Sequence, residues 1–331
     1  MKMHRIIGNN EVAAAVNSEE TTAFEKRKIY RDSLARHDPV PVLSSIVSVT
    51  PQWTSDPLLS VPPIWDLPSL QIPSIWSHYG TRGEGVNVYV LDSGYSAHPA
   101  FSVRSGRCFL PGIEETTDGL GHGTWVAGKI GGSGIGIAPK CNIHIGRVLD
   151  ESGTGSVNFT IKALEWVLRE RDPHIVNLSS GSTTPSLELE KLILKLQHRG
   201  VVVVTSAGNY SYDACLTVGA VGRAGQKAEF KTFGGTLDIA THGISSYSSY
   251  LHKSFRALDD KSIVTPIVSG ILALAYSFLR AQGRSTIEIR KVVLDAMLST
   301  ARKIEPRVRE DQYGFGGIDV KKFMAAVHAS N

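Results

Sequence analysis

Four polar side chains in this sequence stand at the ends of apolar runs and together could cleave an acyl bond. Asp92 ends VNVYVLD, His122 lies between glycines in DGLGHGTWVAG, and Ser262 opens SIVTPIVSGILALAYSFL. Asn209 closes VVVVTSAGN. Acyl transfer needs a hydroxyl nucleophile, an imidazole base, a carboxylate that orients the base, and an amide that donates to an oxyanion. Taken singly, each residue has an ordinary explanation as a turn, capping or structural residue, so only the combination predicts chemistry.

Short β-branched runs that alternate with amphipathic segments would position these side chains. In sheets built this way, ligands bind at the carboxyl ends of the strands, where Asp92 and Asn209 would lie. Ser262 would stand at the start of an apolar helix, whose N–H groups favour developing negative charge. The alternation is typical of an α/β fold with a mostly parallel sheet covered by helices. The sequence predicts strands at 86–91, 142–149, 175–178, 201–205 and 216–221, and helices at 157–171, 187–199 and about 263–279.

In their order along the chain, the four motifs resemble those of subtilisin-like serine proteases (subtilases, peptidase family S8). VNVYVLDSG is similar to the family's Asp motif, GHGTWVAG to its His motif, TSAGN to its oxyanion motif and SIVTPIVSG to its Ser motif. GIAPKCNIHIGRVL, IVNLSSG and YGFGGIDVKKFMAAV follow the family as well, so the resemblance extends from about Val61 to the end of the chain. It implies a three-layer α/β/α fold with a mostly parallel central sheet.

The resemblance also implies a mechanism for each of the four residues. Asp92 would orient His122, and His122 would take the proton of Ser262 as that hydroxyl attacks a peptide carbonyl. The side-chain amide of Asn209 and the backbone N–H of Ser262 would hold the oxyanion. These roles imply a serine endopeptidase that forms an acyl-enzyme intermediate.

A peptide substrate is expected to bind as an extended strand between two edge segments, as in other cases of β-augmentation. A third segment would form a wall of the pocket for the residue before the cleaved bond. By resemblance, the substrate-binding residues are Ser152, Gly153, Thr154, Gly155, Ser179, Ser180, Gly181, Ser206, Ala207 and Gly208.

Two departures from the family pattern affect these expectations. Asp260 and Lys261 precede Ser262 where the family usually has Gly and Thr, which leaves open a catalytically impaired, peptide-binding member of the fold. A hydrolase that acts on an ester with the same triad is a further alternative. The segment GKIGGSGIGIAP lacks the Asn/Asp-rich insertion that forms a calcium site in many relatives, so no metal and no cofactor are expected.

The composition excludes several other classes of protein. Lys and Arg number 35 against 31 Asp and Glu, and a net charge of +4 is too small to indicate a nucleic-acid or anionic-membrane partner. Three widely spaced cysteines exclude a disulfide scaffold and a thiolate zinc site, and are typical of a reducing compartment. With neither a signal-like apolar region near the start nor an 18-residue apolar run, the sequence predicts a cytoplasmic protein.

Prolines divide the sequence near residue 60. Eight of the 15 prolines fall between Pro39 and Pro73, and an extended chain is expected from His37 to about Ser60. Upstream, Ser18 is a candidate N-cap of a short charged helix. The prediction is an N-terminal extension at 1–60 followed by a catalytic domain at 61–331. Part of 37–59 is expected to lie across the Ser262 cleft and block it, the alternative being a tail or a strap elsewhere on the domain.

Overall fold

A computed structural model gives the structure of the protein over most of the chain. It describes residues 46–49, 51, 55–62, 64–182, 186–207, 214–221, 237–243, 246–258, 261–304 and 314–330. The helix predicted after Ser18 lies outside these residues, as do Gly208, Asn209 and Asp260.

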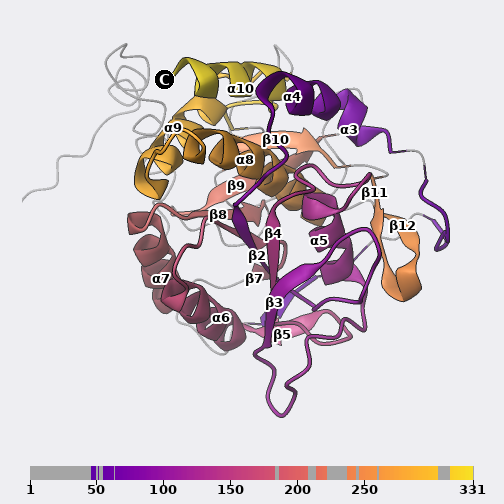
Figure 1. Cartoon of the computed structure of the whole chain (residues 1–331). Helices are drawn as coiled ribbons and strands as arrows, with labels where there is room; N and C mark the ends of the chain where they lie inside the picture. Colours follow the sequence, from indigo (N-terminus) through magenta and orange to yellow (C-terminus); the bar gives the residue numbers. More distant parts are fainter. Residues whose placement is uncertain are drawn as a thin grey trace, which may run out of the picture.

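The centre of the fold is a parallel sheet of seven strands in the order β10-β9-β8-β6-β2-β4-β3 (Figure 1). The middle strands are short runs of β-branched residues whose two faces are both buried, as expected for a sheet covered on both sides. The strands are β2 (Asn87–Asp92), β3 (Val103–Cys108), β4 (Asn142–Arg147), β6 (Ile175–Leu178), β8 (Val202–Ser206), β9 (Leu216–Val221) and β10 (Ile239–His242).

Helices cover the two faces of this sheet and complete three layers (Figure 1). In β2, Val88 and Val90 pack into the core on one face, whereas Tyr89 and Leu91 pack into the core on the other. α6 (Val157–Arg169) and α7 (Leu187–His198) close the second of these cores. The first is closed by α3 (Asp66–Ser69), α4 (Ile72–Tyr79), α5 (His122–Gly131), α8 (Val264–Arg280), α9 (Thr286–Ser299) and α10 (Val320–Ala329).

This architecture confirms the predicted α/β/α fold, with the strand and helix bounds shifted by one or two residues at most positions. Fraying at element ends accounts for differences of this size. The predicted strand at 86–91 is found at Asn87–Asp92, and the predicted helix at 157–171 ends at Arg169. Among the helices that the structure describes, none has the length and apolar character that crossing a membrane requires.

Two small sheets flank the main one and were absent from the sequence prediction. The first has the order β5-β1-β7 and consists of β1 (Ile46–Ser48), β5 (Thr154–Ser156) and β7 (Gly181–Ser182). The second, called here the β11–β12 ribbon, is an antiparallel pair of β11 (Ser246–Ser249) and β12 (Phe255–Leu258), joined by the 3₁₀ turn η1 (Leu251–Lys253). A second 3₁₀ turn, η2 (Lys261–Ile263), leads directly into α8.

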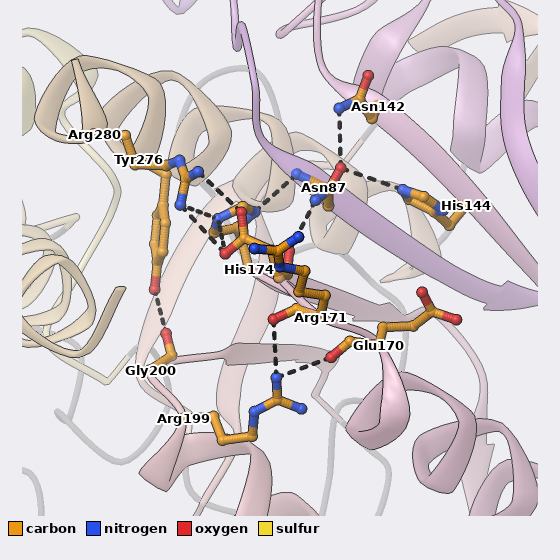
Figure 2. A network of polar contacts seen from close by, with 11 residues as sticks. Asn87, Asn142, His144, Glu170, Arg171, His174, Arg199, Gly200, Tyr276 and Arg280 are labelled. Carbon is orange, nitrogen blue, oxygen red and sulfur yellow. Dashed lines mark hydrogen bonds and ion pairs between the residues drawn. The ribbon is translucent and has the colours of Figure 1, made fainter. Parts of the chain in front are cut away.

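At the amino ends of the central strands, polar side chains form a partly buried network (Figure 2). The backbone N–H of Asn87 donates to Nδ1 of His174 at 2.9 Å, and the Asn87 side chain bonds to Asn142 at 2.9 Å. Arg280 of α8 forms an ion pair with Asp172 at 2.9 Å. The network therefore fixes the strand starts and the end of α8 at the edge of the sheet opposite Asp92.

Candidate active site

Asp92 and His122 meet at the carboxyl end of β2. Nδ1 of His122 lies 2.7 Å from Oδ1 of Asp92, and neither side chain is exposed to solvent. Because an ionised carboxylate only accepts hydrogen bonds, the ring donates from Nδ1. The lone pair of the neutral imidazole is then on Nε2, which is the arrangement a general base requires.

Asp118 fixes the loop that delivers His122 to this position. Its buried carboxylate accepts five hydrogen bonds, two of them from the backbone and the hydroxyl of Thr124 in the first turn of α5. Ser93, which follows Asp92, donates to Asp118 at 2.9 Å and accepts from the backbone of Gly123 at 2.9 Å. The two loops are thus bonded to one another directly behind the Asp92–His122 pair.

The sequence analysis gave no role to Asp118, Ser93 or Thr124. The sequence carries a weak signal for Asp118, since an Asp in a glycine-rich turn often accepts a hydrogen bond from the backbone two residues further on, as Asp118 does from Leu120. The pattern could not reveal that five donors converge on one carboxylate, because one of them, the hydroxyl of Ser93, comes from a segment 25 residues away in the chain.

Ser262 lies in η2, immediately before α8, and is 2% exposed. The sequence analysis expected it at the start of this helix, and the structure places it there. α8 is almost wholly buried and packs beside α5, so the segments that carry Ser262 and His122 belong to one core. Pro266 lies within the first turn of α8, where a missing N–H costs least.

The β11–β12 ribbon, which precedes Ser262, is bonded to the His122 helix. The hydroxyls of Ser248 and Ser249 donate to the carbonyls of Trp125 and Thr124 at 2.7 and 2.9 Å. In return, the indole N–H of Trp125 donates to the carbonyl of Arg256 at 2.9 Å. The two segments are therefore held together through side-chain bonds to backbone groups.

The two predicted substrate-binding edges lie one strand apart. Thr154 and Gly155 belong to β5, with Ser152 and Gly153 in the turn before it, and Gly181 begins β7. Ser179 and Ser180 are buried just before β7, and Ser179 accepts a hydrogen bond from Asn177 at 2.8 Å. Ser206 and Ala207 are buried at the end of β8. Gly208 is outside the described residues.

A strand of the protein itself fills the space between these edges. β1 pairs antiparallel with β5 on one side, where Val47 faces Gly155, and with β7 on the other, where Ser48 faces Gly181. Val47 and Val49 are buried, whereas Ser48 between them is exposed. The N–H of Val49 continues the pairing by donating to the carbonyl of Gly153 at 2.9 Å.

The glycine at position 153 is needed for this close approach. Gly153 has a φ of +77°, and a Cβ there would lie 2.6 Å from the carbonyl oxygen of Val49. A larger residue would therefore be strained and would also displace the chain at Val49.

Residues 55–58, further along the chain, lie against the ribbon. Leu58 and Phe255 exchange backbone hydrogen bonds of 2.7 Å, and Arg256 donates to the carbonyl of Ser55 at 2.9 Å. The stretch from Ser55 to Leu58 thus lies along β12, which leads to Ser262.

Comparison with known proteins agrees with this architecture. A family model described as "Subtilase family" (Peptidase_S8) matches residues 83–316. M-protease of Shouchella clausii (strain KSM-K16) is 33% identical over 309 residues, which cover 81% of this chain and 80% of that protein. The chain belongs to the subtilase family. Subtilisin Savinase of Lederbergia lenta is 38% identical over 229 residues, covering 65% of this chain and 84% of that protein.

As a subtilase, the protein is a subtilisin-like serine endopeptidase, a hydrolase of peptide bonds. Its substrates are therefore proteins or peptides. Within the described part of this subtilase, no group of three or more His, Cys, Asp and Glu side chains is arranged to hold a metal ion.

Proposed function

We propose that Asp92, His122 and Ser262 form the catalytic triad of this endopeptidase. The observation that carries the proposal is the 2.7 Å contact between Nδ1 of His122 and Oδ1 of Asp92, both fully buried at the carboxyl end of β2. Nε2 of His122 accepts the proton of the Ser262 hydroxyl as Oγ attacks the scissile carbonyl. The imidazolium that forms is stabilised by Asp92 and then protonates the leaving amine, after which water releases the acyl group by the same steps.

The oxyanion in this proposal is held by the backbone N–H of Ser262 and the side-chain amide of Asn209. The position of Ser262 directly before α8 supports the first donor, since the N–H groups at a helix start face developing negative charge. Asn209 is proposed from its motif. Removal of one side-chain donor of this kind costs about 10²–10³ in kcat. Asn209→Ala should therefore lose that factor with little change in KM.

A fluorophosphonate that labels an activated serine tests the triad. The wild-type protein should be labelled and Ser262→Ala should not. Ser277→Ala is a matched control, because Ser277 lies in the same helix and its hydroxyl bonds to the carbonyl of Glu84 at 2.9 Å. Labelling of Ser262→Ala at the wild-type rate would refute the assignment of the nucleophile.

We further propose that β1 inhibits the enzyme by occupying the place of the substrate strand. Support comes from its pairing with both predicted edges, which leaves neither β5 nor β7 open to an incoming peptide. A tethered strand is present at high effective concentration, so modest affinity is enough to keep the cleft filled. In this proposal the N-terminal extension ends near residue 60 and the catalytic domain follows.

Substitutions that unseat β1 in the full-length protein test the inhibition. Val47→Glu combined with Val49→Glu would bury two charges and should release the strand, which raises the initial rate on a peptide substrate several-fold. Ser48→Glu is the matched control, because this side chain is exposed. Equal initial rates for the double variant and the wild type, with no self-cleavage before Val61 in mass spectra, would contradict the proposal.

Residence in the cytoplasm is also proposed, on the basis of the three free cysteines, which are typical of a reducing compartment. Fractionation of cells that produce the full-length protein would test it. Recovery of the protein mainly outside the cells would overturn it.

A further inference from the structure

A buried ion pair lies inside the protein where the mechanism above has no use for a charge. Nζ of Lys129 is 2.8 Å from Oδ2 of Asp66, and the two side chains are 0% and 1% exposed. The hydroxyl of Ser246 donates to the same carboxylate oxygen at 2.5 Å. Oδ1 of Asp66 accepts the backbone N–H of Leu67 at 2.9 Å.

Three separate elements supply this cluster of Asp66, Lys129 and Ser246. Asp66 begins α3, Lys129 lies near the end of α5, and Ser246 begins β11. Lys129 is further held by the carbonyl of Ile135 at 3.3 Å, and its ammonium lies 5.8 Å from the ring centre of Trp125. Both charges are therefore compensated without any contact with solvent.

A buried ion pair is a poor way to gain stability. The cost of removing two charges from water cancels much of their attraction, and apolar residues of similar volume often serve as well or better. What such a pair does supply is a directional contact, because a displaced partner would leave an uncompensated charge in the core. The cluster thus resists sliding of one element past another more strongly than an apolar contact would.

The element that the cluster holds is the helix that begins with His122. Lys129 is seven residues after His122, so it lies on the same face of α5, about two turns further along. Asp118 anchors the first turn of the helix through Thr124, and Lys129 anchors its other end. Every residue of α5 is buried, so the helix has no exposed side along which it could adjust.

Asp66 connects Lys129 to β11, the first strand of the ribbon that precedes Ser262. Ser246 begins β11, whose Ser248 and Ser249 bond to the carbonyls of α5, and β11 continues through β12 to Ser262. The cluster is thus a fourth attachment between the His122 helix and the ribbon. It lies at the end of α5 that the three other hydrogen bonds leave unsupported.

We propose that Asp66, Lys129 and Ser246 are positioning residues, which set the register of α5 against the β11–β12 ribbon and thereby the place of His122 relative to Ser262. The proposal rests on the triad proposed above. Small displacements of reacting groups are costly, since a shift of about 1 Å can lower the rate about 10²-fold. Asp66 acts from the beginning of the catalytic domain, so the domain needs this residue for full activity.

The test compares Lys129→Met, Asp66→Asn and the double variant in the full-length protein. Lys140→Met is the matched control, because Lys140 forms an exposed ion pair with Glu84 at 3.4 Å. Burst titration counts the active sites that can react. Rates divided by this count are corrected for molecules in which β1 occupies the substrate's place. Kcat per titrated site and KM are then measured on one peptide, together with the denaturation midpoint and the proton resonance of His122 Nδ1–H.

Lys129→Met should lower kcat per site at least tenfold, leave KM within twofold and displace the Nδ1–H resonance. The double variant removes both charges, so it should regain the denaturation midpoint while kcat stays low. A double variant with kcat within twofold of the wild type and an unmoved resonance would overturn the proposal, even if Lys129→Met fails to fold. Retention of wild-type kcat by Ser262→Ala would instead refute the proposed triad.

Discussion

Two buried histidines lie beside aspartates at the two ends of the parallel strands. One is at the carboxyl ends, called here the carboxyl edge, and the other is at the amino ends, called the amino edge. At the carboxyl edge, His122 faces Asp92 at 2.7 Å. At the amino edge, His174, which is labelled in Figure 2, has Nε2 at 3.3 Å from Oδ1 of Asp172. Both histidine side chains are fully buried, but Asp92 is buried as well, whereas the side chain of Asp172 is 43% exposed.

The two imidazole rings are oriented differently, and this difference distinguishes the proposed catalytic pair from a structural one. His122 turns Nδ1 to the carboxylate, which puts the lone pair on Nε2. His174 instead accepts the backbone N–H of Asn87 with Nδ1, so the lone pair of that nitrogen is already used. Arg280 also binds Asp172 and lies 2.6 Å from Nε2. A histidine beside an aspartate therefore does not indicate a general base unless the second nitrogen can reach a substrate or nucleophile.

The largest effect is expected when the two aspartates are changed in the same way. Asp92→Asn should lower kcat about 10⁴-fold, because an amide does not hold the required tautomer of His122. Asp172→Asn should leave kcat within about twofold. Kcat per titrated site measures both, and circular dichroism confirms that both variants are folded. Comparable losses in the two variants would mean that the amino-edge network also serves the reaction.

A glycine-to-alanine substitution at each edge adds one methyl group and extends the comparison. A Cβ at Gly123 would lie 2.3 Å from the carbonyl oxygen of Gly94, beside the Asp92–His122 pair. Gly123→Ala should therefore displace the start of α5, destabilise the fold by about 1–3 kcal/mol and lower kcat. At Gly85 there is open space but a φ of +73°, so Gly85→Ala should cost about 1 kcal/mol and leave kcat unchanged.

Denaturant unfolding and kcat per titrated site measure these two variants. If Gly123→Ala were as active as the wild type, the start of α5 would be more tolerant than its contacts indicate. A loss of kcat in Gly85→Ala would show that the amino edge is coupled to the site.

The strand that ends at Asp92 and the strand β8 could be predicted from sequence because short apolar, β-branched runs such as VVVV are typical of buried strands. Strands β3 and β1 could not. β3 reads VRSGRC and is largely exposed, and β1 is only three residues long in a proline-rich stretch, so neither has a clear local signal. The place of β1 between β5 and β7 depends on contacts more than 100 residues apart in the chain.

The same distinction holds for the site. The pairing of Asp92 with His122 and the place of Ser262 before α8 could be predicted because their motifs are local. Lys129 could not be predicted as a buried residue, because lysine is almost never fully buried unless it is paired. Its partner Asp66 lies 63 residues away and carries no sign of the pairing. The sequence does not reveal buried polar contacts between segments that are far apart along the chain.

A smaller effect is expected from acid. Burial lowers the pKa of His144 and His174 from 6.5 to about 4, aided by Arg104 at His144 and by Arg280 at His174. Between pH 6.5 and 4 the unfolded chain therefore binds protons that the folded protein does not. Stability is complete above about pH 6.5 and falls as the pH decreases toward 4, by about 3 kcal/mol at most for each histidine.

Urea unfolding of the Ser262→Ala protein at several pH values measures this slope without self-cleavage. Replacement of both histidines by Asn should flatten it, because Asn keeps an acceptor but does not titrate. His198→Asn is the control, since that histidine is exposed. An unchanged slope in the double variant would assign the acid sensitivity to carboxylates instead.

The smallest effect separates the two charges around His174. Arg280 lowers the pKa of His174, whereas Asp172 raises it. Arg280→Met and Asp172→Asn both break the same half-exposed ion pair, so each should cost up to about 1 kcal/mol at pH 7.5.

The two substitutions should change the pH dependence of stability in opposite directions. Without Arg280, the pKa of His174 moves up toward its value in the unfolded chain, so less stability is lost as the pH decreases. Without Asp172, the pKa of His174 falls further, so the loss of stability continues to lower pH. Urea unfolding between pH 7.5 and 4.5 in the Ser262→Ala protein resolves the two slopes. Parallel curves would show that these charges do not reach the ring, and that burial alone keeps His174 neutral.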